Sequence, residues 1–230
     1  MKTIADVKQY WETHPLLSYE LEQPGSKEYF SRLDKAKRLD SDRFALPYWE
    51  FDHYTHKTVL DVGCGPGWLT VQYALGGAQV YALDLTAKAV ELTKKHLQLY
   101  NVTANVREGN AEQLDFPDNF FDLVVSSGVL HHTPETYTCF TECYRVLKPG
   151  GGAKITLYYK GLLHAKPVFR FTTAIMKLLQ VRHPGANLAT AVDVDEFIRQ
   201  YDGFDNPVGI GKTKREWSAL LQRAGFRIVG

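Results

Sequence analysis

The chain has 230 residues, of which 44% are hydrophobic, and its 27 basic and 26 acidic residues leave a formal net charge of +1. This composition predicts one domain with a sizeable buried core and room for an appended cap. A near-neutral chain has no global field that recruits nucleic acid, so we expect no nucleic-acid partner. The three cysteines follow neither a disulfide pattern nor a metal-ligand pattern, which indicates a reducing compartment and a cytoplasmic protein with no metal site. We expect no signal peptide, because charges interrupt the start of the chain, and no transmembrane segment, because no uncharged run reaches ~18 residues.

Residues 1–57 precede the first predicted strand, and we interpret them as an N-terminal helical lid segment. Helices are predicted at Ile4–Trp11 and at Lys27–Leu39, the second capped by Ser26. The segment is rich in aromatic side chains, which suit a lid over a ligand and suit ordinary packing equally well. They are Tyr10, Trp11, Tyr19, Tyr48, Trp49 and Tyr54.

The first strand runs into a glycine-rich loop. Thr58–Val62 is a short β-branched and apolar run, and Gly63, Gly65 and Gly67 follow it before a helix expected at Trp68–Leu75. Glycines let the backbone turn with positive φ and let a ligand lie against it, while the first amides of the helix face that ligand. The spacing G-x-G-x-G differs from the dinucleotide fingerprint G-x-G-x-x-G, and no Gly-Lys-Ser/Thr follows to form a phosphate loop. A nucleotide-like ligand is therefore predicted.

The next two predicted strands each lead into a polar side chain. Gln79–Leu83 ends in Asp84, whose carboxylate can accept hydrogen bonds from both hydroxyls of a ribose. The alternative role of Asp84 is an N-cap for the helix that starts near Thr86. Ala104–Glu108 is the third strand, and Asn110 follows it in a loop that can be read as an ordinary polar turn.

The fourth strand is predicted at Phe121–Val125, and the paired histidines His131 and His132 follow it. A helix is expected to start with Thr133 as its N-cap and to continue to Leu147. The Lys-Pro-Gly-Gly run that comes next should end this helix and reverse the chain into a fifth strand at Ala153–Tyr158.

Residues 58–158 resemble the class I S-adenosylmethionine-dependent methyltransferases of small-molecule type (methyltransferase domain 11/25-like), with every motif in order. The motifs are Asp61 before G-x-G-x-G, the acid Asp84, and then Phe-Asp-Leu-Val-Val, Leu-His-His and Leu-Lys-Pro-Gly-Gly. The resemblance implies S-adenosyl-L-methionine as the cofactor, with Asp84 at its ribose and Asn110, where many members have Asp, at its adenine. The implied cofactor-binding residues are Asp61, Gly63, Cys64, Gly65, Gly67, Asp84, Leu85, Asn110, Ala111, Glu112, Ser127, Gly128 and His132, with Tyr10 and Trp11 from the lid.

The resemblance also implies the activity, methyl transfer (EC 2.1.1.-) to a small molecule such as a secondary metabolite, a quinone or a lipid-like acceptor. A general base is needed only where the acceptor must lose a proton, and His131 and His132 are the catalytic candidates because they follow the fourth strand. A packing or helix-start role is the alternative for either histidine. Two other readings of the chain stay open, namely a non-catalytic S-adenosylmethionine-binding module and, against the glycine spacing, a nicotinamide-dependent oxidoreductase.

The C-terminal part is predicted to contain an insert and the last core helix. Lys160–Val181 is apolar and aromatic with basic residues spaced through it, so it is either a cap over the substrate cleft, with Phe169 and Phe171 closing over the cofactor, or a peripheral membrane contact. A final helix at Thr213–Arg223 and an edge strand at Arg227–Val229 follow. The family fold normally ends with two antiparallel edge strands, so we expect the chain to be a fragment of a longer protein.

The predicted fold class is α/β, a Rossmann-like open and mainly parallel sheet with helices on both faces and a small helical cap. The predicted boundaries are 1–57 for the lid, 58–159 for the cofactor-binding core, 160–211 for the insert, and 212–230 for the last helix and edge strand. The oligomeric state has no signature in the sequence.

Overall fold

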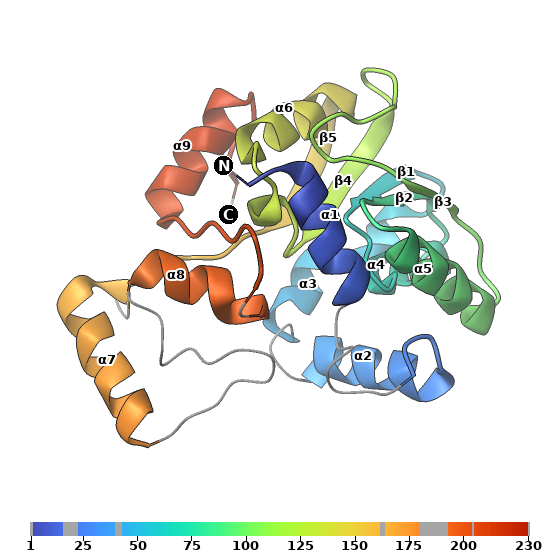
Figure 1. The fold of residues 1–230 in the computed structure, drawn as a ribbon. Helices are drawn as coiled ribbons and strands as arrows, with labels where there is room; N and C mark the ends of the chain where they lie inside the picture. The colour runs from blue at the N-terminus through green and yellow to red at the C-terminus, as the bar shows by residue number, and fades with distance from the viewer. Residues whose placement is uncertain are drawn as a thin grey trace.

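The structure, a computed structural model, describes residues 2–15, 23–39, 43–161, 164–179, 193–203 and 205–229. Its centre is a five-stranded sheet in the order β3-β2-β1-β4-β5, with every neighbouring pair parallel (Figure 1). The strands are β1 (Thr58–Val62), β2 (Gln79–Asp84), β3 (Asn105–Glu108), β4 (Phe121–Ser127) and β5 (Leu147–Thr156). The predicted Rossmann-like parallel sheet is therefore confirmed.

The described helices connect and flank these strands. The α-helices are α1 (Ile4–Thr13), α2 (Lys27–Leu39), α3 (Leu46–Trp49), α4 (Trp68–Leu75), α5 (Ala87–Tyr100), α6 (Thr136–Val146), α7 (Lys166–Leu178), α8 (Val194–Arg199) and α9 (Lys214–Arg223). Short 3₁₀ turns lie at Arg43–Ala45, Phe51–Tyr54, Leu130–His132 and Gln200–Asp202. Several helix starts have a side-chain cap, as at Ser26, whose Oγ accepts a hydrogen bond from the Tyr29 amide at 3.1 Å.

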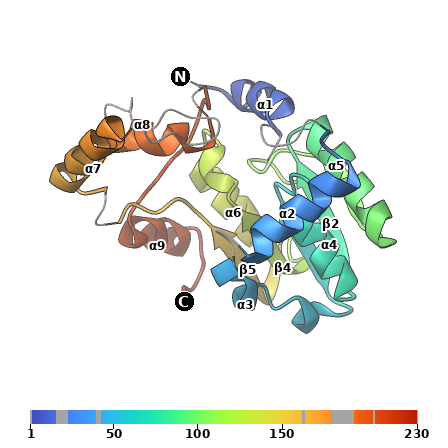
Figure 2. The same cartoon turned by 90° about the horizontal axis from the view of Figure 1, so that it is seen from below.

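Alternate residues of the central strands pack on opposite faces of the sheet. Leu60 and Val124 join a buried cluster with α6 and α9, whereas Val59 and Leu123 join a second cluster with α2 and α4. Figure 2 shows helices on both sides of the sheet. Burial on both faces explains why these strands are nearly continuous apolar runs, and it leaves the strand ends as the place for polar side chains.

Three predicted boundaries are wrong. Helix α6 starts at Thr136 because the Thr133 hydroxyl does not cap it; that hydroxyl donates to the Leu130 carbonyl at 3.1 Å. Strand β5 starts at Leu147, before the Lys-Pro-Gly-Gly run, which forms an irregularity inside the β4–β5 pairing. Residues 227–229 form no strand, since Gly225, at φ +112°, turns the chain so that Phe226 packs edge-on against Tyr144 of α6.

Helices α1 and α7 differ in how closely they lie to the sheet and its flanking helices. Helix α1 lies beside the core, and its Glu12 carboxylate accepts a hydrogen bond from the Lys88 amide in the first turn of α5 at 3.1 Å. Helix α7 projects away from the sheet in both views (Figures 1 and 2). Within the described ranges no helix is long and apolar enough to cross a membrane.

Candidate functional site

A pocket lies at the carboxyl end of the sheet. It is lined by the residues that follow β1, β2, β3 and β4, and by side chains of α1, α2, α4 and α5. Among the predicted cofactor residues, those that line it are Trp11, Asp61, Gly63, Cys64, Gly65, Asp84, Leu85, Asn110, Ala111, Ser127, Gly128 and His132. Loops far apart in the sequence therefore meet at one site, as expected for parallel strands.

The three loop glycines have different roles. All have positive φ, at +76° for Gly63, +51° for Gly65 and +82° for Gly67. A Cβ on Gly63 would lie 2.3 Å from Val129 and one on Gly67 would lie 2.8 Å from Thr93, whereas a Cβ on Gly65 meets nothing within 4 Å. Gly63 and Gly67 are thus required for packing, and Gly65 presents its bare backbone to the pocket.

The Asp84 carboxylate holds the loop in this shape. It accepts hydrogen bonds from the Gly65 amide at 2.9 Å, the Thr86 amide at 3.0 Å and the Thr86 hydroxyl at 2.8 Å. Burial raises the pKa of Asp84 despite these bonds. A carboxylate has about four acceptor sites, so one remains for a ribose hydroxyl and a second hydroxyl must displace an existing partner. The helix N-cap belongs to Thr86, whose Oγ accepts from the Ala89 amide at 3.3 Å.

Asp61 is the most deeply buried acid of the pocket, with 1% of its surface exposed. Its carboxyl accepts a hydrogen bond from the Thr70 hydroxyl at 2.6 Å. Burial raises the pKa of Asp61 to about 7, and the nearby Asp84 adds to the effect. A cationic ligand group beside Asp61 would favour its ionised form.

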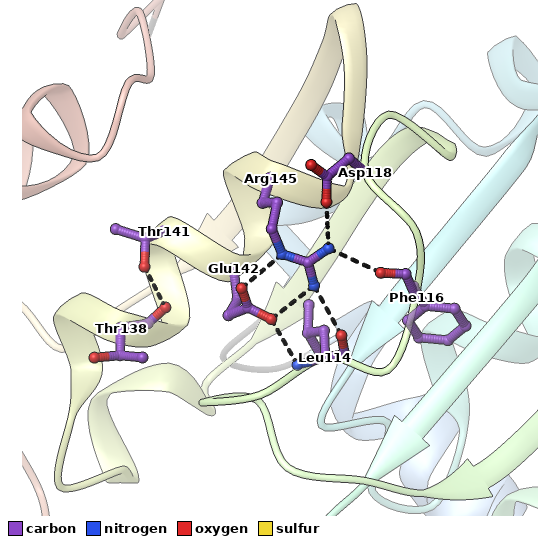
Figure 3. Close-up of polar contacts among 7 residues, drawn as sticks. All are labelled: Leu114, Phe116, Asp118, Thr138, Thr141, Glu142 and Arg145. Carbon is purple, nitrogen blue, oxygen red and sulfur yellow. Dashed lines mark hydrogen bonds and ion pairs between the residues drawn. The ribbon is translucent and has the colours of Figure 1, made fainter.

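Arg145 of α6 makes polar contacts that hold the loop following β3 in place (Figure 3). The Arg145 guanidinium donates to the carbonyls of Leu114 and Phe116, both at 2.8 Å, and pairs with Asp118 and Glu142, both at 2.7 Å. Glu142 in turn accepts from the Leu114 amide at 2.8 Å. These contacts fix the loop whose first residues enter the pocket.

The side chain of Asn110 is engaged within this loop. Its oxygen accepts from the Glu112 amide at 2.9 Å, which leaves one lone pair of that oxygen for a ligand. Glu112 does not line the pocket, because its carboxylate accepts from the Glu135 amide at 3.0 Å. Gly67 and Tyr10 also do not line the pocket, although the structure places both next to residues that do.

The two histidines are in unlike surroundings. His131 is fully buried, does not line the pocket, and lies 4.1 Å (ring centroids) from Tyr158. Within the described residues neither of its ring nitrogens has a hydrogen-bond partner, and burial, helped by His132, holds its pKa well below the ordinary value. The ring of His131 is therefore neutral and does not reach the pocket. This position matches the packing role that was the alternative to catalysis for His131.

His132 lines the pocket and is held from both ring nitrogens. Its Nδ1 lies 2.6 Å from the Val208 carbonyl, and its Nε2 lies 3.0 Å from the Asp202 carboxylate, which also accepts from the Tyr158 hydroxyl. A carbonyl only accepts, so a hydrogen on Nδ1 would be donated to Val208. His132 and Asp202 therefore form a close pair on the pocket wall.

Sequence reasoning missed two charged pocket residues, Asp202 and Lys37. Asp202 comes from a turn-rich region with no recognisable motif, and only the fold brings it to His132. Lys37 follows Leu33 by four residues on α2, and Leu33 is buried against the pocket. That helical spacing was a signal that Lys37 faces inward.

The predicted lid aromatics divide into two groups. Trp11 lines the pocket and its ring lies 5.3 Å from that of His132. Phe169 packs against Phe197 and Phe171 is 66% exposed, so neither closes over the pocket as predicted. Tyr19 lies outside the described residues. In the part of the chain that the structure describes, no cluster of His, Cys, Asp and Glu could hold a metal ion.

Comparison with known proteins identifies the core. A family model described as a methyltransferase domain matches residues 60–154. Residues 60–154 resemble this domain. The chain also aligns with curated relatives named ubiquinone biosynthesis O-methyltransferase, at 38% identity over 96 residues in Nitrosospira multiformis and 34% over 93 residues in Cereibacter sphaeroides. The alignments cover 41% and 40% of this chain and only 40% and 38% of those relatives.

Solved structures share the fold over a longer stretch. A SAM-dependent methyltransferase from Aquifex aeolicus matches with a TM-score of 0.56 at 16% identity, covering 89% of this chain and 90% of that one. The [4+2]-cyclase SpnF matches with a TM-score of 0.64 at 19% identity, covering 99% of this chain and 74% of that one. The fold of this chain is thus shared by a methyltransferase and by a protein named as a cyclase.

The cofactor implied by this domain is S-adenosylmethionine, and the pocket fits it. The open spaces beside Gly65 and Gly128, where a Cβ would meet nothing within 4 Å, leave backbone accessible to a ligand. Asp84 has an acceptor site for a ribose hydroxyl, and the buried Asp61 suits a cationic group. Apolar side chains such as Leu85, Ala111 and Val129 line the remaining wall and suit an adenine ring.

Proposed function

We propose that the protein is an S-adenosylmethionine-dependent methyltransferase acting on a hydroxyl group of a small, quinone-like or related lipid-like acceptor. The observation that carries the proposal is the pocket at the carboxyl end of a methyltransferase domain, with a bare glycine backbone and two acids. The names of the relatives, which specify O-methyl transfer in ubiquinone biosynthesis, support a ring hydroxyl as the acceptor. Because the chain spans about two fifths of those relatives, substrate and activity are proposals.

The protein's contribution is alignment and exclusion of water. When bound, the cofactor would supply a methyl group activated by its positive sulfur to an acceptor oxygen and would leave as the neutral thioether. The glycine loop, Asp84 and Asp61 would hold the donor, and the apolar lining would keep water away. The acceptor's proton must leave as the new C–O bond forms, and the Asp202–His132 pair is the titratable group of the pocket wall best placed to receive it.

Two measurements test this function. Calorimetric titration should show binding of S-adenosylmethionine and none of comparable strength for NAD. Incubation with methyl-labelled cofactor and a panel of hydroxylated quinols and phenols should then transfer label to at least one acceptor. Tighter binding of NAD would refute the cofactor, and cofactor binding without transfer to any acceptor class would favour the non-catalytic module.

We further propose that α1 is a lid. Support comes from Ile4, Val7 and Trp11, which line the pocket, and from the Tyr10 hydroxyl, which donates to the Asp202 carbonyl at 2.8 Å. Amide hydrogen exchange in residues 4–13 should slow when S-adenosylmethionine is added. Removal of residues 1–15 should lower turnover far more than the free energy of unfolding. Equal exchange with and without saturating cofactor, together with normal turnover, would make α1 ordinary packing.

A peripheral membrane contact through α7, in a cytoplasmic protein, is also part of the proposal. Phe171, Ile175 and Leu178 are exposed at helical spacing, and the exposed Arg170 lies beside them. The protein should float with phosphatidylglycerol vesicles, and Phe171→Asp should reduce flotation. The matched control is Phe44→Asp, since Phe44 is 71% exposed on another part of the surface. Equal flotation of the two variants would remove α7 from the contact.

A further inference from the structure

Tyr158, which follows β5, contacts the pair formed by His132 and Asp202 without lining the pocket. Its hydroxyl donates to Oδ2 of Asp202, and Nε2 of His132 lies 3.0 Å from the same oxygen. His132 and Asp202 line the pocket, whereas Tyr158 does not. A ligand in the pocket can therefore reach the pair, and the Tyr158 hydroxyl can affect a reaction there through the Asp202 carboxylate.

Packing fixes the place of Tyr158. Its backbone carbonyl accepts a hydrogen bond from the Trp217 indole of α9 at 2.8 Å. Its ring lies 4.1 Å from the ring of His131 and 5.7 Å from that of Tyr201, measured between centroids. His131 is fully buried, so it acts as a packing surface for the tyrosine ring. These contacts hold the Tyr158 hydroxyl at Asp202.

His132 is held on its other side by the chain segment that also supplies Asp202. Its Nδ1 lies 2.6 Å from the Val208 carbonyl and 3.3 Å from the side-chain nitrogen of Asn206. Asn206 is fully buried. Contacts at Nδ1 orient the ring so that Nε2 stays toward Asp202. The oxygen between His132 and Tyr158 therefore has a fixed neighbour on each side.

The proposed methyl transfer to a hydroxyl group needs such an arrangement. The bond from the acceptor oxygen to the methyl carbon forms while the methyl–sulfur bond breaks, and the hydroxyl proton passes to the His132–Asp202 pair and then to water. A pair that already holds that proton cannot take it up. A hydrogen bond donated to a carboxylate favours its ionised form, so the Tyr158 hydroxyl opposes protonation of the pair before the reaction.

We propose that Tyr158 is a positioning residue of the methyl transfer, whose hydroxyl holds the Asp202 carboxylate at His132 and keeps the pair ready to receive the acceptor's proton. This inference rests on the proposed function, because it assigns the third member of the group that takes the proton. Tyr158 itself does not touch the acceptor.

Other titratable and charged groups lie around the pair. They are His131 of the same 3₁₀ turn, Tyr10 of α1, Arg199 and Glu196 of α8, and Tyr201 of the following turn. Burial, helped by His132, holds the pKa of His131 well below its ordinary value, so this neighbour is neutral. Removal of the Tyr158 hydroxyl leaves each of these groups in place, so a change in titration reports that hydroxyl.

The test is Tyr158→Phe, which removes the hydroxyl and keeps the ring. Nitrogen-15 NMR of the whole histidine-labelled chain follows the titration of the pair without any acceptor, with the His132 signal assigned as the one lost in His132→Gln. The midpoint of this titration should rise by about one pH unit in Tyr158→Phe, as expected for loss of a hydrogen bond to a charged group. Tyr137→Phe is the control, because the Tyr137 hydroxyl donates to the Arg223 carbonyl outside the pocket, and its midpoint should match the wild type.

A double-mutant cycle separates this role from a structural one. In an Asp202→Asn background, Tyr158→Phe should cause no further shift, since the carboxylate through which it acts is absent. With an acceptor found by the labelled-cofactor screen, Tyr158→Phe should move the acid limb of the kcat profile up by the same amount. On that limb kcat should fall roughly tenfold, with the affinity for S-adenosylmethionine unchanged.

The outcomes separate this inference from the proposed function. An unchanged midpoint in folded Tyr158→Phe, or an equal shift with and without the Asp202 carboxylate, would overturn the role of Tyr158 and leave the proposed function intact. Absence of S-adenosylmethionine binding by the wild type would refute the function instead. Thermal unfolding shows whether each variant is folded. If Tyr158→Phe is not, 3-fluorotyrosine in place of Tyr158 is the second variant: its hydroxyl is a stronger donor, so the midpoint should fall, and an unchanged midpoint would again refute the role.

Discussion

Replacing Asp61 with asparagine should make the empty protein more stable and the cofactor complex weaker. Burial raises the pKa of Asp61 to about 7, from an ordinary value of 3.8. The Thr70 hydroxyl, which donates to this carboxyl at 2.6 Å, can donate equally to an amide oxygen. Asparagine therefore resembles the protonated side chain at every pH.

The direction of the pH effect follows from the raised pKa. Between pH 3.8 and about 7 the folded protein keeps a proton on Asp61 that the unfolded chain has released. Stability from this group is therefore complete below pH 3.8 and is lost as the pH rises to about 7. Between pH 5 and pH 8 the free energy of unfolding of the wild type should fall relative to Asp61→Asn by at most ~3 kcal/mol.

Urea denaturation of both proteins at several pH values measures this difference. Asp122→Asn is the matched control, because burial raises the pKa of Asp122 but bonds from Lys148 and Thr58 outweigh it and hold the pKa at about 2. That substitution should lower stability by an amount that is constant between pH 5 and pH 8. A constant difference for Asp61→Asn as well would mean that Asp61 is ionised in the folded protein, and the reasoning would fail. Asp61→Asn should also bind S-adenosylmethionine at least roughly tenfold more weakly, since it lacks the negative charge that suits a cationic group of the ligand.

Three further substitutions test how the pocket is built. Gly65→Ala should abolish most cofactor binding. Gly150→Ala is the control, because Gly150 also has positive φ and open space for a Cβ, so it should cause similar backbone strain and leave binding intact. Calorimetric titration of both variants decides whether Gly65 touches the ligand. Asp84→Asn should weaken binding by roughly 10- to 100-fold through loss of charged bonds to the ribose and the loop amide, and normal affinity in the folded variant would move the ribose site elsewhere. Arg145→Lys should lose the paired hydrogen bonds to the loop after β3. Partial exposure of the guanidinium limits the expected loss in the free energy of unfolding to about 1–3 kcal/mol, and binding of the adenosine part should weaken severalfold. Unchanged hydrogen exchange in residues 109–118 would contradict this.

The sequence determined the core of this protein because its signals are local. The apolar run Thr58–Val62 and the glycines that follow specify a buried strand and a turn with positive φ, whatever surrounds them. The side chains that end β1, β2, β3 and β4 were predicted to meet, since parallel strands bring their carboxyl ends to one edge. The order of motifs from Asp61 to the Lys-Pro-Gly-Gly run was enough to predict the methyltransferase fold and its pocket.

The tertiary structure decided what depends on distant partners. Adjacent in sequence, His131 and His132 differ because one ring faces the core and the other meets Asp202, some seventy positions later in the chain. Thr133 is a residue type that favours the N-cap position. In the structure its hydroxyl instead donates to the Leu130 carbonyl, and α6 starts at Thr136. For Lys37, the spacing from Leu33 indicates an inward-facing side chain, but only the docking of α2 on α4 brings it to the pocket. Such choices depend on which surface each side chain meets after folding, and local spacing carries no information about that surface.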